Sequence, residues 1–208
     1  NHRNDDYCEG TAWQWTWFVP HDVDGLVELM GGRDAFIGKL DSLFTADSKL
    51  EGESTSVDIS GLIGQYAHGN EPSHHIAHLY NYVGQPWRTQ EIVDEVLHTL
   101  YFNNPDGLSG NEDCGQMSAW YILNAMGFYQ VCPGKSVYSI GRPLFNEATV
   151  HLKDGKSFKV IAHNNSRDNK YVRSIVLNGN KLETPFFTHQ DIVDGGTLEL
   201  TMGSEPLK

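Results

Sequence analysis

The spacing of apolar residues changes at Pro133-Gly134, and this change constrains the fold more than any other feature of the sequence. Before it, apolar residues recur three and four positions apart, as over residues 22–30, which is the pattern of one helix face. After it, short β-branched runs are separated by turn pairs such as Asp154-Gly155 and Asn178-Gly179, which are typical of hairpins. The sequence therefore predicts an α+β fold that is helical first and built of antiparallel strands afterwards.

Glycines divide the helical part into short segments. Gly31-Gly32 separates two amphipathic stretches, which we expect to form an antiparallel helical hairpin. Pro72 suits the first turn of a later helix, Thr89 suits the N-cap of the next, and Gly127 would end the last. The expected helices are 13–18, 22–30, 33–44, 72–83, 90–101 and 117–126, with a surface loop at 46–60; the expected strands are 149–152, 157–162, 174–177 and 197–202. This organisation predicts a helical domain over 1–134 and a β-rich region over 135–208.

Charge and cysteine content argue against several classes of protein. The 15 basic and 27 acidic residues give a formal charge of −12, and the basic residues are scattered. No nucleic acid partner is expected, because phosphate binding needs a positive stripe. No run of about 18 apolar residues occurs, so no membrane span is predicted. Three cysteines, Cys8, Cys114 and Cys132, define no disulfide framework, and the residues themselves leave localisation unknown.

Three loops share one sequence pattern, in which acidic and amide side chains stand just ahead of an aromatic-rich helical run. They are Asp5 to Gly10, Gly69 to His75, and the glycine-bounded stretch from Asn103 to Asp113. Glycines permit tight turns, so such loops can hold carboxylates at fixed points. Three of them in one chain suggest that several helices end at one polar pocket.

Glu9 and Asp113 are the carboxylates best placed for acid and base chemistry. Glu9 precedes Trp13, Trp15 and Trp17, and apolar aromatic surroundings favour the neutral form of a carboxyl group, as a general acid requires. Glu9 is equally explained as a helix-start carboxylate. Asp113, beside Asn111, is a candidate base that activates water, or simply a cap of the following helix. A pocket of tryptophans and carboxylates is typical of sugar sites, although tryptophans are most often core.

Asn70 and Glu71 offer hard oxygen ligands of the kind that Ca²⁺ prefers, whereas no Cys or His spacing fits zinc. His74 and His78 have the i, i+4 spacing of a metalloprotease helix, but no glutamate follows His74, so both also fit a structural role. Calcium, if bound, would use dispersed ligands because no EF-hand loop is present.

Three ordered blocks, YCEGTAWQW from Tyr7, GLIGQYAHGNEPSHH from Gly61, and GLSGNEDCGQMSAW from Gly107, resemble the hallmark segments of glycoside hydrolase family 92, the calcium-dependent exo-α-mannosidases. The resemblance implies an N-terminal β-sandwich and a six-hairpin α/α barrel, of which this chain would be the C-terminal portion. The sandwich and the remaining half of the barrel would then be its partners within the same enzyme. A periplasmic or secreted location is also implied.

The resemblance assigns roles to individual residues. It implies that Glu9 is the general acid and Asp113 the general base of an inverting hydrolysis that releases terminal mannose from glycans. Asn111 stands where many members have a second acidic residue that helps to place the water. Asn70 and Glu71 match the calcium-site stretch, and the candidates for contacting the sugar are Trp13, Trp15 and His74.

A second hypothesis belongs to a different class. The chain can instead be a non-catalytic module that binds carbohydrate or completes a larger fold. Turnover of an α-mannoside by this chain would favour the enzyme over the non-catalytic module.

Overall fold

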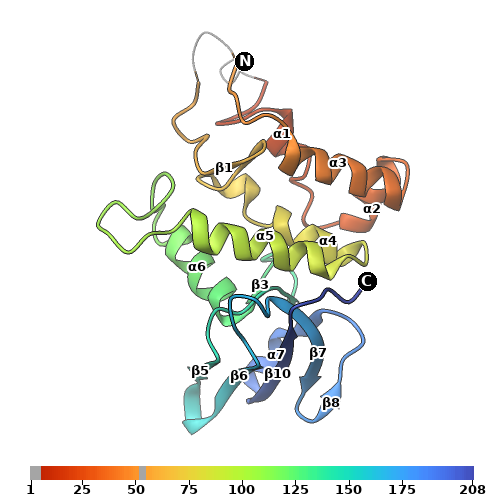
Figure 1. Ribbon diagram of the computed structural model, residues 1–208, viewed down its shortest axis with the longest axis vertical. Helices are drawn as coiled ribbons and strands as arrows, with labels where there is room; N and C mark the ends of the chain where they lie inside the picture. Colours follow the sequence, from red (N-terminus) through yellow and green to blue (C-terminus); the bar gives the residue numbers. More distant parts are fainter. Residues whose placement is uncertain (1–5, 52–54) are drawn as a thin grey trace. The chain divides into compact units, whose positions relative to one another are not determined.

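The computed structural model describes residues 6–51 and 55–208. They form two compact units that are both discontinuous in sequence (Figure 1). The first contains Asn1–Ala77 and His98–Ala119, and the second contains His78–Leu97 and Trp120–Lys208. Asp5 and part of the predicted 46–60 loop lie outside the described residues, and the predicted boundary at residue 134 stays a prediction.

The core of the first unit is built by a helical hairpin. Asp22 caps the first helix by accepting a hydrogen bond from the Gly25 amide, and Gly31-Gly32, both at positive φ, turn the chain into the second. Phe36, Leu40 and Leu43 of the second helix are fully buried, and Trp17 packs edge-on against Phe36. The elements of this unit are α1 (Ala12–Trp15), α2 (Val23–Leu29), α3 (Arg33–Thr45), β1 (Leu62–Ile63), β2 (Tyr66–Ala67) and η1 (Glu71–Ser73). The predicted hairpin of helices is confirmed.

A two-stranded hairpin, β1–β2, lies between the predicted surface loop and the start of η1. Its turn contains Gly64 at φ 60°, where a Cβ atom would lie 2.4 Å from the Leu43 carbonyl oxygen. The next amide, that of Gln65, donates to the same oxygen at 2.7 Å. The turn therefore sits directly on the end of α3, and only glycine fits there.

The second unit is a layer of helices and two sheets. Most of helix α5 and most of helix α6 belong to it, and its five-stranded sheet has the order β5-β6-β10-β7-β8 (Figure 1). A three-stranded sheet has the order β3-β4-β9. Only the last residue of η2 (Ile76–His78) belongs to this unit. Its other elements, in whole or for the most part, are α4 (Leu79–Tyr82), α5 (Pro86–Thr99), α6 (Gln116–Met126), β3 (Phe128–Tyr129), β4 (Val137–Ile140), β5 (Glu147–His151), η3 (Lys153–Gly155), β6 (Ser157–His163), β7 (Tyr171–Leu177), β8 (Asn180–Lys181), β9 (Phe186–Thr188), α7 (His189–Val193) and β10 (Gly196–Gly203).

Alternation of buried and exposed residues builds the core of this unit. Along β6, Phe158, Val160 and Ala162 point inward, while their neighbours are more exposed. The ring of Phe187 in β9 stacks on that of Phe158, with 5.8 Å between the ring centroids, and Ile192 of α7 belongs to the same core. The sheet therefore has one apolar face, as period-two patterning predicts. The predicted α+β class is confirmed, whereas the six-hairpin barrel stays a prediction.

The prediction that all the strands are antiparallel is wrong for one pair. Strand β10 lies between β6 and β7, antiparallel to β7 but parallel to β6. Gly195-Gly196, a third glycine-containing pair that the sequence predicts as a hairpin turn, instead joins α7 to β10, and the Gly195 amide donates to the Ile192 carbonyl. Because the chain passes through β7, β8, β9 and α7 first, β10 enters the sheet from the same end as β6.

Two helix predictions also need correction. Thr89 does not cap a helix, since α5 begins at Pro86 and Thr89 lies buried inside it. The helix expected over 72–83 is broken into η1, η2 and α4. In its first part, the His74 and His75 rings bond backbone oxygens of His68 and Trp17, which holds the segment in short 3₁₀ turns.

Candidate active site

Glu9 lies in the turn before α1, with its side chain exposed and its backbone at φ 53°. Asn70 holds this turn, because its Nδ2 donates to the Glu9 carbonyl oxygen at 3.0 Å and lies 3.4 Å from Glu9 Oε2. Thr11 is the N-cap of α1 and forms a capping box with Gln14. Glu9 is therefore not needed as the cap of this helix, which leaves its carboxylate available for another role.

Glu71 lies close to both candidate catalytic carboxylates. It is half-buried, and Asn70 caps its 3₁₀ turn by accepting a hydrogen bond from the Glu71 amide at 3.2 Å. Partial burial raises the pKa of Glu71, and the nearby charges of Asp113 and Glu9, with a side-chain hydrogen bond to Asp113, raise it further. Such a shift requires all three carboxyl groups to be close in space. The structure thus brings together residues that are about a hundred positions apart in sequence.

Asp113 begins a run of three successive left-handed residues. Asp113, Cys114 and Gly115 have φ values of 51°, 56° and 94°, and α6 starts at Gln116. The Glu112 carboxylate accepts hydrogen bonds from the Ser118 amide at 3.1 Å and from its hydroxyl at 2.9 Å. Glu112, rather than Asp113, therefore serves the start of this helix, and the exposed Asp113 side chain is left at the site.

Close backbone contact explains why these loops meet. A Cβ atom on Gly69 would lie 2.7 Å from the Ser109 carbonyl oxygen, and one on Gly110 would lie 2.9 Å from the Gly69 oxygen. The two loops approach each other at positions where only glycine leaves room. Asn111, which is exposed, follows directly after this contact.

His74 is fixed by protein groups on both sides of its ring. Its Nε2 lies 2.9 Å from the His68 carbonyl oxygen, so it must carry the hydrogen, and its Nδ1 accepts from Gln116 Nε2 at 3.0 Å. Burial lowers the pKa of His74 to about 4, against the opposing effect of the carbonyl hydrogen bond. A neutral His74 thus ties the 68–75 loop to the first residue of α6. Direct contact of His74 with substrate stays a prediction.

His68 adds further buried hydrogen bonds to those made by His74. Its two ring nitrogens lie 2.8 Å from the Tyr66 hydroxyl and 2.7 Å from the Tyr101 hydroxyl, and burial, followed by neighbouring His74, lowers its pKa well below the usual value. Sequence reasoning missed Tyr66, Tyr101 and Gln116. Gln116 stands three positions after Asp113, but no pattern of residue types marks it as the partner of His74.

The metal prediction can be compared with the donors present. Within residues 6–51 and 55–208, no group of three or more His, Cys, Asp or Glu side chains is arranged to hold a metal ion. Asn70 and Glu71 nevertheless supply hard oxygens, and a divalent cation would favour the charged form of Glu71, whose pKa is raised. Two protein donors are fewer than the six to eight oxygens that Ca²⁺ takes. The donor chemistry therefore fits calcium as part of a ligand set.

The two tryptophans predicted to meet sugar have different surroundings. Both are half-buried. Trp15 donates from its indole nitrogen to the Cys8 carbonyl at 2.8 Å, which steadies the Glu9 turn. Trp13 borders a separate cavity formed with residues of the 46–51 loop. Contact of either with substrate stays a prediction.

Comparisons with known proteins decide the family. The sequence profile of the glycosyl hydrolase family 92 catalytic domain matches residues 1–204. The chain belongs to glycosyl hydrolase family 92. It is also 32% identical over 200 residues, 95% of its length, to a protein of Arthroderma benhamiae described as an uncharacterized secreted glycosidase, of which it covers 24%.

Two solved structures of the family are similar to this chain. The GH92 α-mannosidase BT3965 of Bacteroides thetaiotaomicron, in complex with mannoimidazole, is 43% identical with a TM-score of 0.91, over 97% of this chain and 26% of that one. The GH92 inverting mannosidase BT2199 of the same species is 44% identical with a TM-score of 0.83, over 96% of this chain and 28% of that one. The chain thus spans about a quarter of the length of its relatives.

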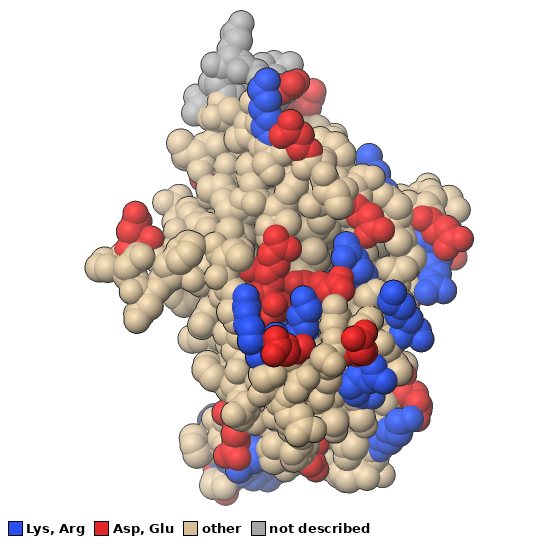
Figure 2. Space-filling model, in the orientation of Figure 1, with Lys and Arg blue, Asp and Glu red and all other residues tan. Residues whose placement is uncertain are grey.

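The surface and helix lengths add two observations. Figure 2 shows lysine and arginine side chains lying beside aspartates and glutamates on the face in view. Among the described residues, no helix has both the length and the apolar character needed to cross a bilayer.

Proposed function

We propose that this chain supplies an acid and a base to an inverting, Ca²⁺-assisted exo-α-mannosidase that removes terminal mannose from glycans. The observation that carries the proposal is that Asn70 bonds both the Glu9 turn and the Glu71 amide, which places the Glu9 and Glu71 carboxyl groups at one site, with Asp113 close enough to raise the pKa of Glu71. Family membership supports glycoside hydrolysis, and the similar solved structures are α-mannosidases. A secreted location is proposed on the name of the Arthroderma relative, and the family resemblance implies a periplasmic location as the alternative.

The chemistry assigns different tasks to the two carboxyl groups. Glu9 donates its proton to the glycosidic oxygen as the bond to the anomeric carbon breaks. Asp113 accepts a proton from a water molecule that attacks the anomeric carbon from the opposite face of the ring. An inverting pair needs roughly 6.5–9.5 Å between its carboxyl groups to leave room for that water. Asn111, two residues before Asp113, offers an amide to orient the water.

Asn70 and Glu71 would hold the calcium ion. When bound, Ca²⁺ supplies positive charge and a template for sugar hydroxyls. Asn70 has a second task, since its amide nitrogen fixes the turn that carries Glu9. The same residue would thus couple metal binding to the position of the acid.

The test is the configuration of the first sugar released. Proton NMR of an α-mannoside digest, recorded before mutarotation, is expected to show β-mannose, with the rate falling after treatment with a calcium chelator and returning on adding Ca²⁺. Initial release of α-mannose would overturn the inverting mechanism. Binding of mannosides without any release of mannose would favour the non-catalytic hypothesis.

A further inference from the structure

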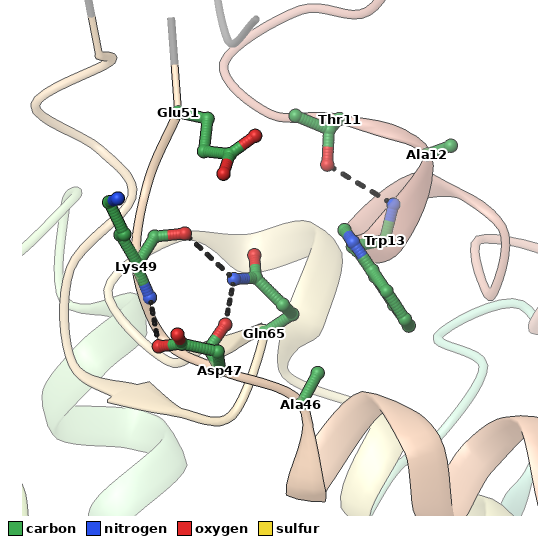
Figure 3. A pocket seen from close by; sticks show the side chains of 8 residues that line it. All are labelled: Thr11, Ala12, Trp13, Ala46, Asp47, Lys49, Glu51 and Gln65. Carbon is green, nitrogen blue, oxygen red and sulfur yellow. Dashed lines mark hydrogen bonds between the residues drawn. The ribbon is translucent and has the colours of Figure 1, made fainter.

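We propose that the cavity beside Trp13 binds a second hexopyranose unit of the glycan, apart from the sugar that is cleaved. This inference rests on the proposed function for its ligand class. The cavity has a volume of about 450 Å³ and is lined by Thr11, Ala12, Trp13, Ala46, Asp47, Lys49, Glu51 and Gln65 (Figure 3). None of the three clustered carboxylates lines it. Its size falls within the roughly 300–1,000 Å³ of small-molecule sites.

The floor of the cavity carries a side-chain amide oxygen that faces the open space. Gln65 is 6% exposed, and its Nε2 donates to the carbonyl oxygens of Asp47 at 2.6 Å and Lys49 at 3.4 Å. These bonds fix the amide, so its oxygen must point the other way. Figure 3 shows this oxygen turned into the open space between Glu51 and Trp13. Among the described residues this oxygen has no hydrogen-bond partner, so a hydroxyl group in the cavity can donate to it.

One wall is an aromatic ring held in place. Lys39 Nζ lies 5.1 Å from the centre of the Trp13 ring, which steadies the indole beside the cavity. A pyranose presents a flat C–H face that packs on such a ring, and its hydroxyls donate to acceptors around the rim. The Gln65 oxygen and the Glu51 carboxylate, which points into the same space, are such acceptors (Figure 3). With two carboxylates against one ammonium, the lining disfavours anions and suits a neutral polyol.

The cavity and the acid share one piece of chain. Thr11 and Trp13 follow Glu9 by two and four positions, and Gln14 Nε2 donates to the Gln65 backbone oxygen at 2.7 Å. The bond between Gln14 and Gln65 therefore joins α1 to the cavity floor. A sugar held by Trp13 would belong to the same glycan whose terminal bond Glu9 cleaves, so the cavity would favour longer glycans.

The experiment compares two probes by isothermal titration calorimetry. It uses the complete polypeptide with the substitution Glu9→Gln, so that neither sugar is hydrolysed. The probes are methyl α-mannopyranoside and a linear mannotriose, and the measured quantity is the ratio of their Kd values. We expect mannotriose to bind about tenfold tighter. Trp13→Ala should cut that gain about five- to tenfold, and Glu51→Ala about threefold, whereas Trp13→Phe should keep most of it.

Phe18→Ala is the matched control, because Phe18 is an exposed aromatic of the same segment that does not line the cavity. It should leave the ratio unchanged. Circular dichroism would identify a variant that fails to fold, and Glu51→Ala then decides, since Glu51 is exposed. An unchanged ratio in both Trp13→Ala and Glu51→Ala would overturn the proposal, including the case in which another part of the polypeptide fills the cavity. Failure of the proposed function is a separate result, namely no mannose release by the unmutated protein.

Discussion

Left-handed backbone occurs at non-glycine residues in two regions, for different reasons. In the second unit it falls on Asp154, Asn164 and Asn178, residue types that tolerate this conformation in turns. In the first unit it falls on Glu9, Asp113 and Cys114, around the candidate active site. Glutamate and cysteine have no such tolerance, so surrounding bonds must impose the conformation. Backbone strain of this kind, of order 1–3 kcal/mol per residue, gathers at functional sites.

The comparison teaches that the turns of the sheet are local, whereas the turns of the site are tertiary. Asn178 and Gly179, at φ 50° and 81°, form the two-residue turn between β7 and β8 by their own backbone conformations. The Glu9 turn is instead held by Asn70, 61 positions away. The predictions below, from the largest effect to the smallest, test this difference.

Removing either proposed catalytic carboxylate should have the largest effect. Glu9→Gln and Asp113→Asn are each expected to lower kcat/KM by about 10²–10⁴-fold, the usual contribution of general acid or base catalysis. Steady-state kinetics on an α-mannoside would measure this. Asp106→Asn is the control, since Asp106 is an exposed carboxylate of the same loop and should change little. Equal losses in all three variants would contradict the assignment.

Lowering the pH should destabilise the loops of the candidate active site, which are held by buried His74, before it affects the five-stranded sheet. The pKa of buried His74 is lowered from 6.5 to about 4, so the unfolded state binds more protons than the folded state between these values. Stability from His74 is therefore fully present above about pH 6.5 and lost as pH falls toward 4, by at most about 3 kcal/mol. Denaturant unfolding at pH 7 and pH 5 would measure the loss, and His74→Gln should reduce it. If His74→Gln left the difference in unfolding free energy between pH 7 and pH 5 unchanged, this role of His74 would be ruled out.

Adding a side chain to the β1–β2 turn, which contacts the end of α3, should destabilise the first unit. Gly64→Ala places a Cβ atom against the Leu43 carbonyl in left-handed backbone, which we expect to cost about 1–3 kcal/mol of unfolding free energy. Gly38→Ala is the matched control inside α3, where a Cβ atom meets nothing within 4 Å. It should stabilise the protein by about 0.5–1 kcal/mol. Thermal unfolding would reveal whether the two changes indeed have opposite signs.

Relieving backbone strain should give the smallest and most diagnostic effect. Cys114→Gly is expected to stabilise the protein by about 1 kcal/mol, because glycine adopts positive φ without a Cβ clash. Asn178→Gly should instead destabilise it by about 1 kcal/mol through loss of the hydrogen bond to Thr197. Denaturant unfolding of both variants would check the signs. If both changes stabilised the protein, the distinction between local and imposed turns would fail.

Local patterns predicted much of the fold and part of the site. The helical spacing from Asp22 to Met30 and the Asn178-Gly179 turn were readable because each depends on neighbouring residues. The parallel pairing of β10 with β6 was not, because it depends on the path of the chain through four intervening elements. Glu9, Asn70, Glu71 and Asp113 were singled out by type and by family resemblance. The bond between His74 and Gln116, by contrast, joins 42 positions and leaves no local mark.

An experimental structure with mannose bound tests the central claim most directly, through the distance between the carboxyl carbons of Glu9 and Asp113. The account predicts that the two groups lie on opposite faces of the sugar, roughly 6.5–9.5 Å apart, with Glu71 beside Asp113. Carboxyl groups on the same face of the ring, or separated well beyond that range, would contradict it.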